Sequence, residues 1–438
     1  MLQTVVNAFK IKEIRNRIIF TLLMLVVVRL GSQIPTPGIN ADFFSSWFSE
    51  NVGSSFGFFD AVTGGSFENM SVFALNITPY ITSSIIVQLL TIAIPKFEEW
   101  HKEGEDGRKK LIAITRYITV GLALIESLAM SIAFGRQGLY TEFTALNVIM
   151  TVVTLTAGST VIMWIGERIT ERGVGNGISI VLIINIISRL PSDISNLFEQ
   201  FVMGREVATA VLNAAIIIAI IVLVVVLVVL LQDAERRIPV QYSRKVMGRK
   251  QVGGQTTYIP LRVNTAGVIP IIFAQSLLMF PVIICQLLGK TGGTGIGGKI
   301  LGMMSQSNWF DFNTPIYNVG LAIYIALVVA FAYFYTSITF NPLEVADNMK
   351  KQGGFIPGIR PGKPTSDYLS TMLNYIIFIG AVGLVIVAVI PIFFEGVFNA
   401  NISFGGTSLI IIVGVIIETL KQIESQMLVR NYRGFLND

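Results

Sequence analysis

This sequence of 438 residues has very few of the residues from which disulfides, metal centres and most catalytic sites are built. It contains one cysteine, Cys285, and one histidine, His101. A single cysteine excludes a disulfide or a cysteine metal cluster within one chain. Cys285 lies in an apolar run, which favours a small buried side chain. His101 lies in a charged loop, so we expect a solvated side chain rather than a ligand or a base.

Charged residues are also scarce. Asp, Glu, Lys and Arg make up 13% of the chain, and hydrophobic residues make up 53%. A soluble domain is typically about a quarter charged and just under half apolar. The apolar excess therefore predicts contact with lipid. In a membrane protein, a net charge of +5 reflects the side of the membrane on which the basic loops lie, rather than nucleic-acid binding. The basic N-terminal stretch leads into a full-length span without a small-residue cleavage site, so no cleavable signal peptide is predicted.

Long apolar segments recur along the whole chain. A helix that crosses a bilayer needs about 20 mostly apolar residues. Ten segments reach or approach this length, which predicts an all-α polytopic membrane protein with ten transmembrane helices. The segments are roughly 18–34, 68–94, 112–134, 144–165, 177–198, 208–231, 264–288, 314–340, 369–394 and 406–428.

The basic residues are divided unequally between alternate connections. Twenty-five of the 32 Lys and Arg residues fall in the termini and the even-numbered connections, and five fall in the others. Because cytoplasmic loops carry the excess of Lys and Arg, both termini are predicted to be cytoplasmic in a bacterial plasma membrane. The spans divide into two halves, 1–200 and 201–438. Five spans per half reverse the second half in the membrane, which predicts inverted, pseudo-symmetric halves with a pathway between them.

No motif for catalysis or nucleotide binding stands out. Residues 291–299 match GxGxxG formally at Gly293, Gly295 and Gly298, but Ile300 replaces the Ser or Thr that a P-loop uses to hold magnesium. No enzyme activity, cofactor, metal or nucleotide site is therefore predicted. The main candidates for acidic groups within spans are Glu126 and Glu418. A solute transporter, the alternative from the inverted repeat, would need a charged midplane site.

The region of the second predicted span is unusual. Before it, short apolar pieces between 55 and 67 are broken by glycines, which indicates a re-entrant half-helix enclosed by protein or an ordinary surface helix. Within it, Ile77, Ile81 and Ile85 share one helix face. Polar residues occupy the other faces, so this helix is predicted to line an interface or a watery cavity. Packing alone explains the isoleucines about as well as a constriction does.

Two large cytoplasmic loops are predicted to project from the membrane. Residues 232–263 alternate apolar and polar side chains around a glycine-rich bend, which predicts a basic hairpin. Residues 341–368 predict a short amphipathic helix and a tip stiffened by Pro and Gly that carries Arg360. Contact with anionic lipid head groups and contact with a protein partner both fit these loops.

Several of these stretches resemble the SecY family of protein-conducting channels. They are IPTPGI (34–39), FALNITPYITSSIIVQLL (73–90), EGEDGRKK (103–110), GERITERGVGNGISI (166–180), PLRVNTAGVIPIIFA (260–274), FNPLEVADNMKKQGGFIPGIRPGKPT (340–365) and FGGTSLII (404–411). The resemblance implies a channel that moves unfolded secretory chains across the membrane and releases transmembrane segments sideways into lipid. It also implies the partners SecE and SecG, the motor SecA, ribosomes, and substrates with signal sequences, with anionic lipids as further contacts. The energy would come from partners, so no direct nucleotide binding is implied.

The same resemblance implies roles for individual residues. The implied pore ring is Ile77, Ile81, Ile85, Ile178, Leu182, Ile272 and Ile411. The implied plug covers about 55–67 and includes Phe56, Phe58, Phe59, Val62 and Phe67. The implied lateral gate includes Gln88, Gln275 and Ser276. The implied contacts to SecA or the ribosome are Arg360, Arg244, Lys245, Arg249 and Lys250.

Overall fold

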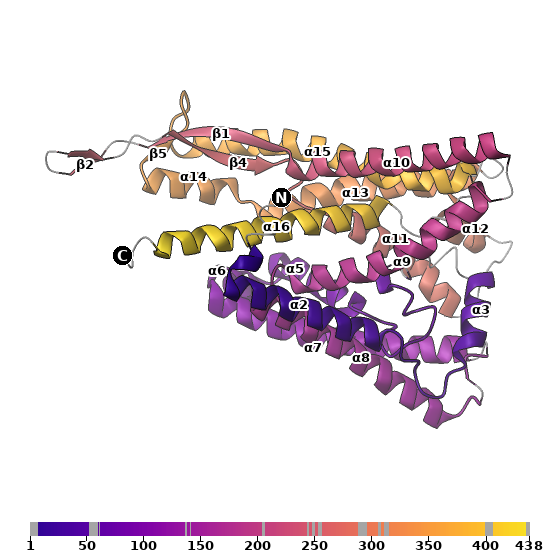
Figure 1. Ribbon diagram of the computed structural model, residues 1–438. Helices are drawn as coiled ribbons and strands as arrows, with labels where there is room; N and C mark the ends of the chain where they lie inside the picture. The colour runs from indigo at the N-terminus through magenta and orange to yellow at the C-terminus, as the bar shows by residue number, and fades with distance from the viewer. Residues whose placement is uncertain are drawn as a thin grey trace.

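The chain forms a bundle of long helices with a small sheet at one end (Figure 1). We call that end of the bundle the strand end and the opposite one the far end. The computed structural model describes residues 8–51, 60, 62–135, 138–140, 142–203, 206–242, 245–247, 250–252, 256–287, 296–304, 308–310, 315–398 and 406–434.

Each of the ten predicted spans overlaps one long helix. The helices are α2 (Lys12–Gly31), α5 (Thr78–Ala93), α7 (Glu105–Gly135), α8 (Ala145–Arg172), α9 (Gly177–Phe201), α10 (Val207–Asp233), α11 (Ile269–Leu287), α13 (Asn318–Thr339), α15 (Lys363–Phe398) and α16 (Gly406–Gly434). Among the described helices, six are long and apolar enough on their own to cross a membrane. A seventh is reached if α5 and the short α6 (Pro95–Lys102) are taken together as one span, although they bend by 102° at their junction.

Several helices are longer than their apolar runs. α7 begins at Glu105 instead of 112, and α8 ends at Arg172 instead of 165. The extra turns carry charged side chains, which stay hydrated without a free-energy penalty. The helical hydrogen bonding of the backbone therefore continues past the apolar segment. Glu167 Oε1 in the extension of α8 forms an ion pair of 2.8 Å with Arg116 Nε, one turn inside the predicted span of α7.

The second span differs most from its predicted start. The prediction began at 68, but α5 begins at Thr78. Residues 68–77 are turns, with Met70 at φ 42° and Asn76 at φ 49°, a left-handed backbone that a helix does not contain. Pro79 in the first turn of α5 and Pro95 in that of α6 occupy the positions that proline favours in a helix.

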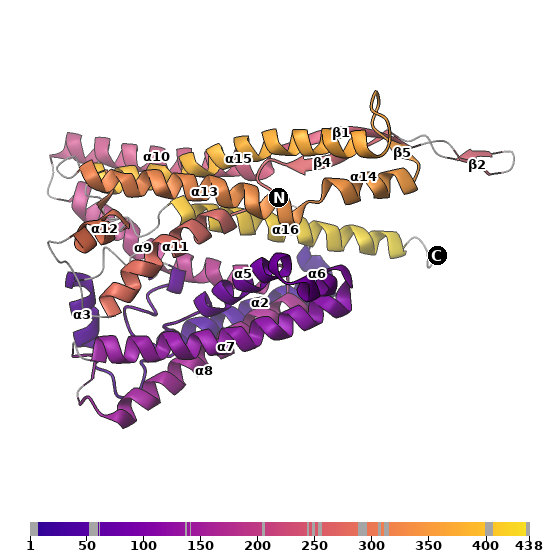
Figure 2. The same ribbon diagram turned by 180° about the vertical axis from the view of Figure 1, so that it is seen from behind.

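Two groups of helices lie on opposite sides of the bundle. Figures 1 and 2 show α2 to α9 on one side and α10 to α15 on the other, with α16 between them. Across this division α16 and α10 pack against α9, and α11 packs against α7. The predicted boundary at residue 200 falls at the last turn of α9.

The predicted hairpin and short helix are present at the strand end. β1 (Glu235–Tyr242) pairs antiparallel with β4 (Thr256–Arg262), and β5 (Gly354–Phe355) adds to the other edge of β1. A separate two-stranded piece joins β2 (Lys245–Met247) and β3 (Lys250–Val252). α14 (Pro342–Lys351) begins after Asn341, whose side chain caps its first turn. Two further helices, α3 (Ala41–Asn51) and α12 (Ile296–Met304), lie at the far end (Figure 1).

Candidate functional site

Aliphatic side chains from four helices meet in one apolar cluster inside the bundle. Six of the seven predicted ring residues belong to it, and we call these six the collar. Three of them are buried, namely Ile77, Leu182 and Ile411. Three more are half-buried and pack against the cluster, namely Ile81, Ile178 and Ile272. Ile85, one turn further along α5, is half-buried and is not a member of the cluster. The structure thus brings α5, α9, α11 and α16 together through uncharged, flexible side chains.

A close helix crossing places Ile178 and Leu182 in the collar. The turn from α8 to α9 passes through Gly175 at φ 77°, and Asn176 Oδ1 accepts from the amide of Ile178 at 3.1 Å. A Cβ at Gly177 would lie 1.9 Å from the carbonyl oxygen of Gly166 on α8. Only glycine lets the two backbones approach this closely, so Gly177 fixes where α9 starts.

A second close approach places Ile77. A Cβ at Gly158 of α8 would lie 1.9 Å from the carbonyl oxygen of Val72. Ser159 Oγ donates to the carbonyl of Asn76 at 3.0 Å. The turn before α5 is therefore held against α8, and Ile77 has no exposed surface.

The described part of the predicted plug runs inside the bundle. Phe56, Phe58 and Phe59 lie outside the described residues. Val62 is buried and belongs to the same apolar cluster as the collar. Phe67 is buried in a second cluster, where its ring lies 6.3 Å from that of Phe134 on α7. The segment therefore links the collar to the core of the far end.

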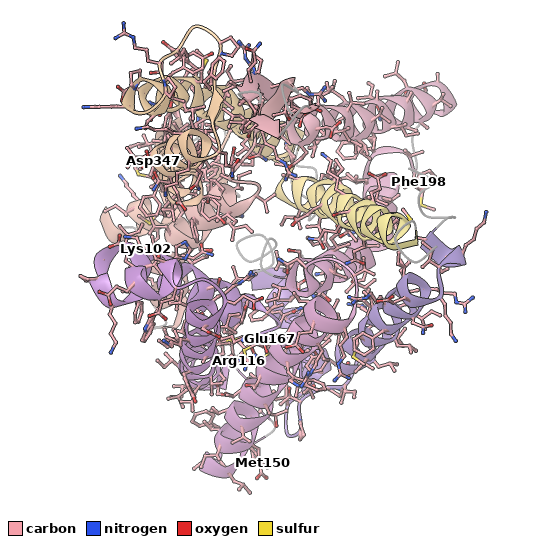
Figure 3. All side chains as sticks on the ribbon, turned by 90° about the vertical axis from the view of Figure 1, so that its left-hand side faces the viewer. Lys102, Arg116, Met150, Glu167, Phe198 and Asp347 are labelled. Carbon is pink, nitrogen blue, oxygen red and sulfur yellow. The ribbon has the colours of Figure 1, made fainter. Side chains whose placement is uncertain are left out.

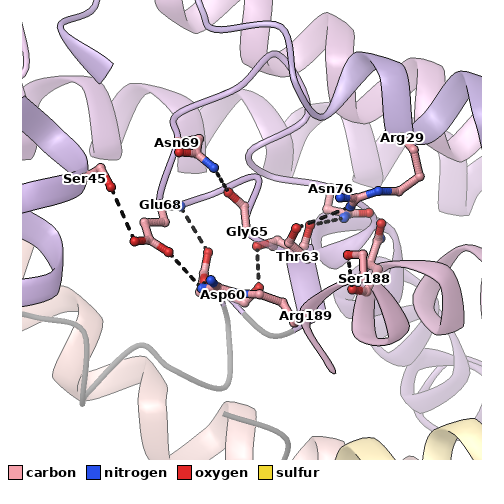
Figure 4. A network of polar contacts seen from close by, with 12 residues as sticks. Arg29, Ser45, Asp60, Thr63, Gly65, Glu68, Asn69, Asn76, Ser188 and Arg189 are labelled. Carbon is pink, nitrogen blue, oxygen red and sulfur yellow. Dashed lines mark hydrogen bonds and ion pairs between the residues drawn. The ribbon is translucent and has the colours of Figure 1, made fainter. Parts of the chain in front are cut away.

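A polar network, which the sequence did not reveal, surrounds this same segment (Figure 4). Arg189 of α9 forms ion pairs with both Asp60 and Glu68, the latter at 2.9 Å. Arg29 of α2 donates to the carbonyl of Gly64 at 3.3 Å. Asn76 Nδ2 donates to the carbonyl of Thr63 at 3.2 Å. A hint in the sequence is that Arg29 stands inside an apolar span, where an unpaired cation is costly.

The predicted gate residues lie on two helices that follow the collar. Gln88 of α5 is half-buried, and its carbonyl accepts from Thr91 Oγ1 at 2.6 Å. Gln275 of α11 is buried, whereas its neighbour Ser276 is exposed. Gln88 lies three residues beyond Ile85, and Gln275 lies three residues beyond Ile272, so each helix carries a gate residue within one turn of a predicted ring residue.

The strand end forms one folded unit from two loops that are distant in sequence. Ile238 and Val240 of β1 pack with Met349 of α14 and Ile356 of the following turn. Arg360 is exposed on the tip between Gly358 at φ 84° and Gly362 at φ 100°. Its carbonyl accepts from Thr365 Oγ1 at 2.9 Å, which holds the tip to the start of α15.

The structure describes two of the four basic hairpin residues that were predicted to contact SecA or the ribosome. Arg244 and Arg249 lie outside the described residues, whereas Lys245 and Lys250 begin β2 and β3. Nearer the bundle, Arg237 Nε donates to Glu235 at 2.7 Å, and its guanidinium lies 4.9 Å from the ring centre of Tyr258. The hydrogen bond to Glu235 raises the pKa of Arg237 above its ordinary value.

Charged side chains also gather beside this unit. Figure 3 looks onto the strand end, where Lys102, Arg116, Glu167 and Asp347 come from α6, α7, α8 and α14. Lys102 Nζ lies 2.6 Å from Glu98 within α6. Trp100 lies between Lys96 and Lys110, whose ammonium groups are 5.5 Å and 5.6 Å from the centre of its ring. These contacts fix α6 across the end of α7.

Known proteins resemble this chain over its full length. The SecY family model matches residues 71–420. The protein translocase subunit SecY of Halalkalibacterium halodurans is 42% identical over 443 residues, covering 100% of both chains. The subunits of the same name from Bacillus subtilis and Streptomyces scabiei are 42% and 43% identical, again over 100% of both chains.

Solved structures share the fold at lower identity. A structure described as a protein conducting channel superposes with a TM-score of 0.64 at 18% identity, covering 94% of this chain and 92% of that one. Sec61 in the canine ribosome-channel complex gives a TM-score of 0.59 at 18% identity, with the same coverage. The fold is thus that of these channels, and the chain is a helical membrane protein with several spans. The matched family model and the full-length relatives together show that this chain belongs to the SecY family.

Proposed function

We propose that this chain forms a channel through which unfolded polypeptides cross the plasma membrane, and that the polypeptide passes through the collar. The observation that carries the proposal is the meeting of six aliphatic side chains from four helices without a charged group among them. Flexible apolar side chains can surround a moving chain without binding any one sequence. Without a chain, an apolar constriction dewets and blocks hydrated ions.

The division between the helix groups supports lateral release of transmembrane segments. α5 and α11 carry the collar residues Ile81 and Ile272 and, beyond them, the polar Gln88 and Gln275. We place the exit between these two helices, because a segment leaving there would meet polar side chains before lipid. An apolar segment gains from that step and a polar one loses, which would sort the two.

We assign the strand end to the cytoplasm and to the partners that supply energy. The excess of basic residues falls in its connections, and the exposed Arg360 lies on a tip held by Ile356 and Thr365. A rigid arginine suits a carboxylate partner, so SecA and the ribosome are proposed to bind here. SecE and SecG are proposed as membrane subunits, and anionic lipids as contacts of the remaining basic side chains.

Photocrosslinking from the collar tests the channel function. A stalled secretory chain should crosslink to a photoreactive residue at Ile81 or Ile272, since both are half-buried in the collar. The control is Ile125 of α7, which is 62% exposed on the outside of the bundle and should face lipid. Crosslinks at Ile125 that equal those at Ile81 and Ile272 would contradict a path through the collar.

A further inference from the structure

We infer that Arg189 is a positioning residue that latches segment 60–68 beneath the collar by joining two carboxylates of that segment. Nothing in the resemblance to the family pointed to this arginine. The consequence of the latch, that it controls how readily the segment leaves the pathway, rests on the proposed channel function. The contact itself stands on the geometry of the described residues.

The two carboxylates differ in burial, and the arginine joins them. The side chain of Asp60 is 1% exposed, whereas those of Arg189 and Glu68 are 25% and 24% exposed. Asp60 Oδ1 also accepts from the amide of Glu68 at 3.0 Å, which closes the segment into a loop. Arg189 thus neutralises a buried charge and fixes both ends of that loop to α9.

Other elements complete the anchorage. Arg29 of α2 reaches the carbonyl of Gly64, and Ser45 of α3 donates to Glu68 Oε1 at 3.3 Å. A Cβ at Gly64 would lie 2.9 Å from Cα of Asn185, so the loop touches the backbone of α9 itself. Asp193 of α9, buried one turn beyond Arg189, is a further acidic group near the guanidinium.

The anchors come from one side of the bundle. Among the described residues, the polar contacts that other elements make with 60–68 come from α2, α3, α9 and the turn at Asn76. All of these belong to the first helix group. Separation of α11 and α16 from that group would leave the latch intact, so release of the segment is a step distinct from parting the two groups.

The charge balance explains why the latch holds. Removing one partner of a buried ion pair leaves the other charge without compensation, which destabilises far more than losing an exposed pair. Without Arg189, the buried carboxylate of Asp60 would keep, among the described residues, the amide of Glu68 as its one hydrogen-bond donor. If the segment then left its buried position, water would hydrate Asp60. The variant would therefore lower the free energy of the released form of the segment relative to that of the seated form.

Cysteine accessibility tests the latch in the full-length chain. The background carries Cys285→Ser and Ser66→Cys, because Ser66 is 1% exposed in the seated segment. A membrane-impermeant maleimide is added from the far side. Arg189→Gln should raise the labelling rate at least about tenfold, as expected for loss of a buried pair. The matched control is Lys299→Gln in α12, which removes an exposed positive charge at the same end and should leave the rate unchanged.

A second variant separates loss of the pair from general damage. Arg189→Gln together with Asp60→Asn removes both charges, so it should label more slowly than Arg189→Gln alone. Glu68→Gln keeps Asp60 paired and should raise the rate less than Arg189→Gln does. Equal rates in the parent and Arg189→Gln, or a double variant that labels faster than the single one, would overturn the latch.

The labelling needs no transport, which keeps the two proposals distinguishable. An unchanged labelling rate in Arg189→Gln would contradict the latch and would not affect the proposed channel function. Absence of crosslinks from the collar to a secretory chain would remove the channel, while the labelling would still report whether Arg189 holds the segment.

Discussion

The collar leads to a quantitative prediction about ion leak. Ile81, Ile178 and Ile272 are half-buried at the collar, whereas Ile77 and Ile411 are 0% and 2% exposed. Changing the first three to serine should alter the pathway with less loss of packing than changing the last two. Full burial of an isoleucine contributes about 1.5–3 kcal/mol, so each half-buried position costs roughly half of that.

The size of the leak follows from the hydroxyl groups. Moving a hydroxyl into an apolar site without a partner costs about 1–3 kcal/mol, and water in the collar removes this cost. The wetted collar is therefore favoured by a similar amount, and each 1.4 kcal/mol is about a factor of ten. The serine variant should conduct ions about ten- to a hundredfold more than the parent when no polypeptide is present.

The assay is the conductance of the purified protein in a planar bilayer. The matched control replaces the same three isoleucines with valine, which removes volume but keeps the collar apolar. A serine variant that is folded and conducts no more than the valine variant would refute the dewetting argument. A valine variant as leaky as the serine variant would show that packing, not polarity, seals the pathway.

Three further outcomes are expected. Arg360→Glu should lower motor-driven export at least about tenfold without a folding defect, since substitutions at exposed positions away from packing change stability little. Lys363→Glu, three residues further on and also exposed, should leave export unchanged. Equal export in both variants together with weaker binding to anionic vesicles would assign the tip to lipid. Gly177→Ala should destabilise the fold by about 1–3 kcal/mol or more, because its Cβ would lie 1.9 Å from the Gly166 carbonyl oxygen. The assay is thermal unfolding, and the control is Gly121→Ala on α7, where a Cβ meets nothing within 4 Å. Equal melting temperatures of the two variants would contradict the close crossing. Cysteine at Lys299 should react with an impermeant reagent from outside intact cells and cysteine at Arg360 should not, and the reverse pattern would overturn the assigned orientation.

The sequence by itself determined the features that depend on local composition. Apolar runs long enough to cross a bilayer located one long helix each, and alternation in 232–263 located the β1–β4 hairpin. The four-residue spacing of Ile77 and Ile81 placed both on one face of the chain, and both lie in the collar. Such signals survive because the bilayer and the helix repeat act on each segment separately.

Tertiary structure alone decided how these segments meet. Residues 68–77 were predicted as helix from their composition, but contacts with α8 hold them as turns at Asn76 and Gly158. Ile85 has the same spacing as its partners and lies one turn beyond Ile81 along α5, yet it is not a member of the cluster. The pair of Glu68 and Arg189 joins residues 121 positions apart. No local pattern encodes such a contact, since it exists only once α2, α3 and α9 have packed around a buried carboxylate whose charge must then be matched.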